Sequence, residues 1–146
     1  MIAFLVAAAF AAIALIHVYW AFGGSLGSEA AVPRAAVASG TDPKAPRPPA
    51  FVPTRAGTLA VAAALAIVAV LIAVQAGWFG PSLQHGALRA VIGVVAAVML
   101  LRAVGDFRLV GFFKRATDSR FARLDTWFYS PLCVALGAGL AAVAAG

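Results

Sequence analysis

Long apolar runs separated by short polar segments set the pattern of this chain. Residues 1–22 contain no charged side chain, and neither do residues 56–79, in which Gln75 is the only strongly polar residue. A helix needs about 20 apolar residues to cross the hydrocarbon core of a bilayer. Each of these two runs therefore predicts a membrane-spanning helix.

Two further runs predict spans with weaker patterns. Residues 84–104 are long enough only if Arg89 extends toward the headgroups and Arg102 finds an internal partner or a headgroup. The fourth run covers residues 126–146, or begins at Ser130 if that residue caps the helix and Pro131 occupies its first turn. We therefore expect an all-α integral membrane protein, a four-transmembrane-helix bundle that forms a single domain over residues 1–146.

The first run has one alternative interpretation, a cleaved signal peptide, because residues 36–39 resemble a cleavage site. No Lys or Arg precedes the run, although such a basic segment is expected in a signal peptide, and the apolar stretch is longer than usual. We therefore interpret residues 1–22 as a retained span.

With four spans, the two long connecting segments lie on the same side of the membrane. Residues 23–55 hold six of the eight prolines, which predicts an irregular strap rather than regular helix. Residues 105–125 mix aromatic and basic side chains, as in segments that lie among lipid headgroups. Asp118 is a candidate N-cap for a short helix before the fourth span. The residues expected to contact anionic headgroups are Arg108, Lys114, Arg115, Arg120 and Arg123.

The basic residues are distributed very unevenly between the two sides. Ten of the 11 Lys and Arg residues lie in the two connecting segments or, for Arg102, at their edge, whereas Arg89 alone lies on the other side. Short cytoplasmic loops are enriched in Lys and Arg. We therefore expect both loops in the cytoplasm, both termini on the non-cytoplasmic side, and a location in the bacterial inner membrane. The net charge of +6 then reflects orientation and attraction to anionic lipids rather than nucleic-acid binding.

Polar and aromatic residues from three spans are expected in one layer near the cytoplasmic surface. They are His17, Tyr19, Trp20, Arg102, Asp106, Asp125 and Tyr129. Arg102 forms either a structural ion pair with Asp106 or Asp125, or an anchor for an anionic ligand headgroup. His17 is either a hydrogen-bonded packing residue or a proton-transfer group. The histidine and cysteine spacing supports neither a haem nor a metal site, and we expect no cofactor.

Three stretches of the chain carry a family resemblance. "IHVYWAFGG", "RAVGDFRLVGFF" and "RFARLDTWFYSPLC" resemble signature stretches of a family of small bacterial membrane proteins, the domain of unknown function 3995 (DUF3995). The resemblance spans nearly the whole chain and implies four helices. It implies the shared positions His17, Trp20, Gly24, Arg102, Gly105, Asp106, Asp125, Tyr129 and Pro131, and it implies no activity.

Two functions fit these observations. The leading hypothesis is a non-catalytic accessory or scaffolding subunit of a larger inner-membrane assembly, because little of the chain is polar and no complete catalytic set is present. The alternative is a small membrane enzyme or carrier for an amphipathic lipid-like or isoprenoid ligand. In that case Arg102 would hold the headgroup, and His17 with Asp106 or Asp125 would move protons.

Overall fold

The computed structural model describes residues 1–34, 48–80, 84, 86–117 and 119–146, and over these ranges the fold is all-α. Its helices are α1 (Ile2–Ala21), α2 (Ser28–Ala31), α3 (Arg55–Gln75), α4 (Gly86–Val104), α5 (Arg120–Leu124), the π-helical turn η2 (Asp125–Tyr129) and α6 (Ser130–Ala145). Four helical stretches are long and apolar enough to cross a membrane: α1, α3, α4 and the continuous run Arg120–Ala145. The all-α prediction with four candidate spans is thereby confirmed.

The fourth span starts earlier than the sequence pattern indicated. Asp118, expected to cap it, lies outside the described residues, and the Ser119 hydroxyl accepts the cap hydrogen bond from the Ala122 N–H at 3.0 Å. Ser130 has helical backbone angles (φ −68°, ψ −45°), so the alternative in which it caps the helix is wrong. The helix passes through Ser130 because the preceding turn is wound as a π-helix, in which the Ser130 N–H donates to the Asp125 carbonyl.

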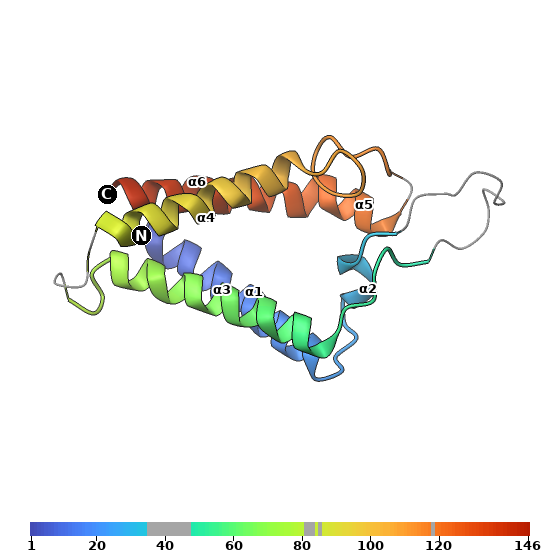
Figure 1. The fold of residues 1–146 in the computed structure, drawn as a ribbon, viewed down its shortest axis with the longest axis horizontal. Helices are drawn as coiled ribbons and strands as arrows, with labels where there is room; N and C mark the ends of the chain where they lie inside the picture. The colour runs from blue at the N-terminus through green and yellow to red at the C-terminus, as the bar shows by residue number, and fades with distance from the viewer. Residues whose placement is uncertain (35–47, 81–83, 85, 118) are drawn as a thin grey trace.

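The spans associate as two antiparallel pairs (Figure 1). Helix α1 packs along α3, and α4 packs along α6. Both termini lie at one end of the molecule, whereas α2 and the turn after α4 lie at the other end, which we call the loop end. The pairs meet near the termini and diverge toward the loop end.

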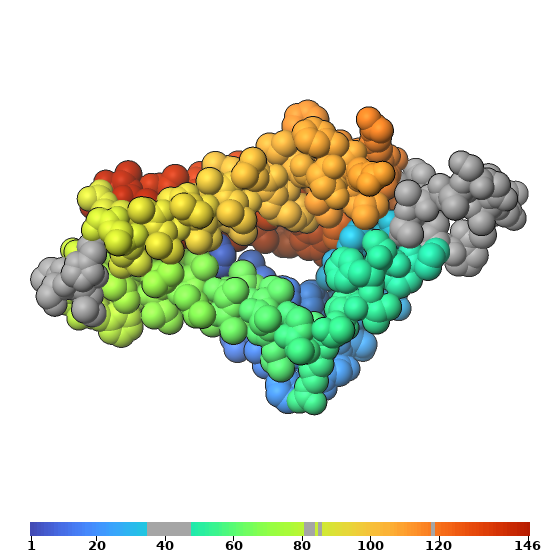
Figure 2. Space-filling model, in the orientation of Figure 1, coloured from blue at the N-terminus to red at the C-terminus, as the bar shows by residue number. Residues whose placement is uncertain are grey.

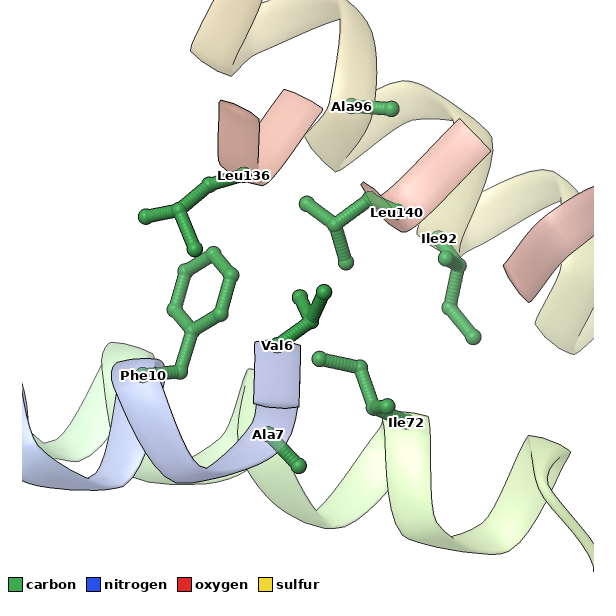
Figure 3. Packing of buried hydrophobic residues seen from close by; sticks show 8 residues of the cluster. All are labelled: Val6, Ala7, Phe10, Ile72, Ile92, Ala96, Leu136 and Leu140. Carbon is green, nitrogen blue, oxygen red and sulfur yellow. The ribbon is translucent and has the colours of Figure 1, made fainter. Parts of the chain in front are cut away.

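The apolar core lies where the two pairs meet. Each long helix contributes side chains to it, so the core fastens one pair to the other (Figure 3). Phe10, Ile72 and Leu140 are almost completely buried there. The full set of buried core residues is Val6, Ala7, Phe10, Ile72, Ile92, Ala96, Leu136 and Leu140.

Outside this core, the spans bury little of their surface. At most 22% of the most hydrophobic window of any span is buried within the protein. Large apolar side chains such as Leu15, Val70 and Leu101 are more than half exposed. Patches of this extent require a non-aqueous environment. The spans are therefore solvated by lipid in a multi-pass membrane protein.

At the loop end, only a few contacts join the diverging pairs. Helix α2 contacts α5, and the Tyr129 hydroxyl donates to the Ala30 carbonyl at 3.2 Å. Nearby, Arg34 and Pro49 form an antiparallel bridge between two positions of the proline-rich strap. The space-filling view shows an opening through the molecule between the pairs, next to these contacts (Figure 2).

Arg89 lies at the terminal end and closes the fourth span there. Its Nε donates to the Ala144 carbonyl at 2.8 Å, and its Nη2 donates to the Ala145 carbonyl. A cation at a helix C-terminus satisfies free carbonyl groups and complements the helix dipole. The charge on Arg89 therefore lies at the end of the bundle. This meets the condition that the third run is long enough to span only if Arg89 extends away from the hydrocarbon core.

Candidate functional site

The turn after α4 folds back tightly on the end of that helix. Gly105 and Gly111 both have positive φ angles, +97° and +87°, and their backbones touch. A Cβ atom on Gly111 would lie 2.3 Å from the Cα of Gly105. The Phe112 N–H donates to the Ala103 carbonyl at 2.8 Å, which satisfies a carbonyl that the end of α4 leaves free. Only glycine fits at the two crossing positions.

Asp106 organises the inside of this turn. One carboxylate oxygen accepts hydrogen bonds from the N–H groups of Arg108, Leu109 and Val110, at 2.9, 2.7 and 3.0 Å. Desolvation raises the pKa of Asp106, but the backbone N–H groups of the turn together outweigh it and hold the pKa below its ordinary value of 3.8. The carboxylate is therefore ionised at neutral pH and acts as the local cap of the turn.

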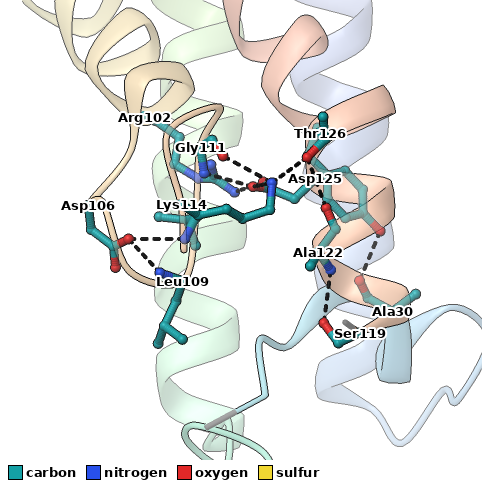
Figure 4. A network of polar contacts seen from close by, with 12 residues as sticks. Ala30, Arg102, Asp106, Leu109, Gly111, Lys114, Ser119, Ala122, Asp125 and Thr126 are labelled. Atoms are coloured by element: carbon teal, nitrogen blue, oxygen red, sulfur yellow. Dashed lines mark hydrogen bonds and ion pairs between the residues drawn. The ribbon is translucent and has the colours of Figure 1, made fainter. Parts of the chain in front are cut away.

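A polar cluster centred on Asp125 joins this turn to the fourth span (Figure 4). Asp125 is completely buried. One of its oxygens accepts from Arg102 Nη2 at 2.8 Å, and the other accepts from the Gly111 N–H at 2.7 Å and lies 3.2 Å from Lys114 Nζ. Lys114 Nζ also donates to the Gly111 carbonyl and to the Thr126 hydroxyl. We call Arg102, Lys114, Asp125 and Thr126, with Gly111, the Asp125 cluster.

The Asp125 cluster corrects two expectations about charged residues. Lys114 was expected to contact lipid headgroups, but its side chain is 2% exposed and its charge faces Asp125. Asp106 was one of two possible partners for Arg102, but it does not face Arg102, because α4 ends at Val104 and the i+4 spacing no longer places both side chains on one helical face. Arg102 pairs with Asp125 instead.

The side chains expected near the end of α1 lie apart from the Asp125 cluster. His17 Nδ1 lies 2.8 Å from the Ile13 carbonyl, and its ring packs edge-on against Trp20. Trp20 Nε1 donates to the Leu26 carbonyl at 2.8 Å. The Tyr19 ring occupies the space where a Cβ on Gly24 would lie. These contacts fold the chain back after α1.

A pocket of about 830 Å³ opens beside these α1 residues at the loop end. Its walls come from the end of α1, from α2, from residues 51–54 of the strap and from the start of α3. His17 and Arg55 are its ionisable lining residues; Trp20, Phe51 and Val61 provide large apolar surfaces. Pockets that bind small molecules have comparable volumes and similar mixtures of apolar walls and a few polar groups.

The remaining predicted residues lie on the surface of the loop end. Arg108, Arg115, Arg120 and Arg123 are exposed, so their contact with headgroups stays a prediction. Tyr129 is half-buried between Phe121 and α2, where it makes the hydrogen bond to Ala30. Around the pocket and the Asp125 cluster, the described residues include no group of three His, Cys, Asp or Glu side chains that could hold a metal ion.

Sequence reasoning did not identify the part of the pocket formed by the strap and α3. Arg55 lies in the first turn of α3, immediately after the capping residue Thr54, whose hydroxyl accepts from the Gly57 N–H at 3.1 Å. A cation is disfavoured at this end of a helix by the helix dipole. That unfavourable position is the one feature of the sequence that could have drawn attention to Arg55.

Comparison with known proteins places the chain in a family. The family model described as "Protein of unknown function (DUF3995)" matches residues 10–140. The chain belongs to the DUF3995 family. The matched range includes all the predicted site residues and Arg55, and it confirms the resemblance found in the three sequence stretches. No curated protein and no solved structure matches the chain.

Proposed function

We propose that this DUF3995 protein binds an amphipathic lipid-like molecule at the loop end, as a small carrier or membrane enzyme. The observation that carries the proposal is the pocket of about 830 Å³ beside His17 and Arg55. It lies at the ends of two spans, where the hydrocarbon core gives way to the headgroup layer. In a membrane, the boundary between the polar headgroup and the apolar tail of an amphiphile lies at this same depth.

The walls of the pocket match both parts of such a molecule. Trp20 and Val61 offer apolar surface, whereas Ser28 and Thr58 offer hydroxyl groups. Figure 2 shows an opening between the diverging helix pairs, and the proposal is that a molecule from the bilayer enters laterally through it. Lateral access suits a ligand that is already dissolved in the membrane.

The proposed setting is the bacterial inner membrane, with the loop end in the cytoplasm and both termini outside. The support is the distribution of basic residues along the sequence, because ten of the 11 lie in the two connecting segments or at their edge. In this orientation the exposed Arg108, Arg115, Arg120 and Arg123 lie at the level of anionic headgroups.

The accessory-subunit hypothesis ranks second. Exposed apolar faces on all four spans suit a partner helix and lipid tails equally well, and they do not favour one over the other. The pocket, by contrast, specifically favours a ligand.

Native mass spectrometry of the gently solubilised protein tests the proposal. We expect the full-length chain to retain one lipid-like molecule, and Val61→Trp to lose it because the indole ring fills the pocket. Val70→Trp is the matched control: Val70 is also an exposed valine of α3, but it does not line the pocket. Equal retention by both variants contradicts the proposal. A stoichiometric partner protein, with no small molecule retained, supports the accessory-subunit hypothesis instead.

A further inference from the structure

The charge of the pocket lining is one-sided. Arg55 contributes a permanent positive charge, and among the described residues no Asp or Glu lines the pocket. Lipid headgroups present phosphate oxygens, which arginine binds well because its planar donors match their geometry. The pocket therefore favours an anionic headgroup over a neutral one.

Arg55 is held at the pocket wall by the ring of Phe22. Its guanidinium carbon lies over the ring, 4.7 Å from the ring centroid, at the distance of a cation–π contact. A guanidinium group carries five N–H donors, and a contact of its charge with an aromatic ring leaves donors available for an anion. An anion beside Arg55 also offsets the unfavourable interaction between this cation and the N-terminal end of the α3 dipole.

His17 provides a second, chemically different contact. A backbone carbonyl only accepts hydrogen bonds, so the 2.8 Å contact with Ile13 requires His17 Nδ1 to donate. In the neutral ring, the other nitrogen, Nε2, is then an acceptor. Nε2 has no hydrogen-bond partner within the described ranges, and His17 lines the pocket. His17 Nε2 is therefore suited to accept a hydrogen bond from a hydroxyl group of a ligand.

We propose that the bound molecule is an acidic phospholipid whose headgroup carries a hydroxyl group. Its phosphate oxygens bind Arg55, and its hydroxyl donates to His17 Nε2. This inference rests on the proposed function and names the ligand class of the same pocket. Phosphatidylglycerol and a phosphate monoester lipid both combine an anionic oxygen with an O–H donor, and the experiment separates them.

The test uses the full-length protein in nanodiscs with four lipids that have the same acyl chains. Phosphatidylglycerol supplies an anion and alcohol hydroxyls, phosphatidic acid an anion and a P–OH group, phosphatidylmethanol an anion without a hydroxyl, and phosphatidylcholine no net charge. We expect one copy of phosphatidylglycerol or phosphatidic acid to be retained about tenfold more than phosphatidylcholine. Whichever of the two is retained more strongly identifies the hydroxyl source. Phosphatidylmethanol is expected between these acidic lipids and phosphatidylcholine.

Variants separate the two contacts. Arg55→Gln removes the charge and is expected to lower acidic-lipid retention about tenfold, with partial recovery in Arg55→Lys. Arg108→Gln is the comparison for general attraction to headgroups, because Arg108 is an exposed arginine of the other loop and does not line the pocket. It is expected to lower acidic-lipid retention much less than Arg55→Gln does. His17→Phe is expected to remove the preference for hydroxyl-bearing lipids over phosphatidylmethanol.

A measurement on the unaltered protein covers the case in which His17→Phe does not fold. With ¹⁵N-labelled histidine, the Nε2 resonance of His17 should shift when phosphatidylglycerol is added and stay in place with phosphatidylmethanol. Unchanged acidic-lipid preference in Arg55→Gln, or equal binding of phosphatidylglycerol, phosphatidic acid and phosphatidylmethanol, overturns the headgroup inference. If Val61→Trp still excludes lipid in that case, the proposed function stands; if Val61→Trp also retains lipid, both proposals fail.

Discussion

Asp125 connects three segments that are distant in the sequence. Its two oxygens contact Arg102 on α4, Gly111 in the turn after α4 and Lys114 beyond that turn. The cluster places two cations against one buried carboxylate, so Asp125 is the shared partner on which both depend. A buried charge that loses its partner is strongly destabilising.

We predict that Asp125→Asn lowers the free energy of unfolding by about 3 kcal/mol or more, because the buried Lys114 and the partly buried Arg102 lose their counter-charge. Chemical unfolding in detergent micelles, followed by circular dichroism, measures the change. Adding Lys114→Met to Asp125→Asn removes one unpaired cation and should restore part of the loss. Glu29→Gln, at an exposed position of α2, serves as the control. An Asp125→Asn protein within about 0.5 kcal/mol of the parent would contradict this role.

At the scale of single residues, the sequence predicted the ion-pair partner of a charged residue better than it predicted which charged side chains are buried. Arg102 had to be paired because an isolated charge inside a membrane is costly, and the sequence offered Asp106, Asp125 or an anionic headgroup as the partner. Lys114 gave no such signal: it lies among exposed-looking basic and aromatic residues, and its burial depends on how the turn folds back. Arg55 joins the pocket only through the tertiary arrangement of α1, α2 and the strap.

Among the secondary-structure elements, the turn between Gly105 and Gly111 positions the Asp125 cluster. It reverses the chain within a few residues of the end of α4, and this brings the Gly111 N–H and Lys114 to Asp125. The close approach of the two glycines leaves no room for a side chain at either position. The cluster therefore depends on backbone geometry as much as on charge.

Substitution of Gly111 by alanine should unfold this turn. The positive φ angle alone costs an L-residue about 1–2 kcal/mol, and the new Cβ would lie 2.4 Å from the Val104 carbonyl oxygen. We expect Gly111→Ala to lower stability by about 2 kcal/mol or more and to speed tryptic cleavage after Arg108, because an unfolded turn fits a protease more easily than a tightly folded one. Gly93→Ala in α4 is the control, since nothing lies within 4 Å of its added Cβ, and it should be neutral or stabilising by up to about 1 kcal/mol. Equal stability of the two variants would show that the turn tolerates a side chain.

The long helices themselves were predictable because the number of consecutive apolar residues decides whether a segment can cross a bilayer. Their ends were less predictable. The fourth span begins at Arg120 rather than near residue 126, because Ser119 caps it and the π-helical turn carries the helix through Asp125. An extra residue in a helical turn leaves no hydrophobic pattern of its own, so the sequence did not indicate η2.

At the scale of the whole molecule, the described parts of the two connecting segments lie at the end opposite to both termini (Figure 1). That arrangement follows from an even number of spans, whereas the direction in which the bundle crosses the membrane depends on charge. The bias of basic residues predicts that the loop end faces the cytoplasm.

Cysteine labelling with a membrane-impermeant maleimide tests this orientation. In a Cys133→Ala background, Ala76→Cys at the end of α3 should be labelled in intact cells. Glu29→Cys on α2 and Arg115→Cys after the α4 turn should be labelled only in inverted membrane vesicles. Reversed labelling of all three would overturn the orientation, and labelling of Glu29→Cys and Arg115→Cys from different sides would contradict the four-span arrangement itself.

The divergence of the two helix pairs has a mechanical consequence for the surrounding bilayer. Near Phe10 the four helices share one core, whereas near Tyr129 the pairs are linked mainly by α2. The cross-sectional area of the protein is therefore larger in one leaflet than in the other. Lipids next to the wider end must move further apart than those across the midplane, as they do on a convex surface. A flat membrane resists that asymmetry, and a membrane curved in the matching sense accommodates the protein at lower elastic cost.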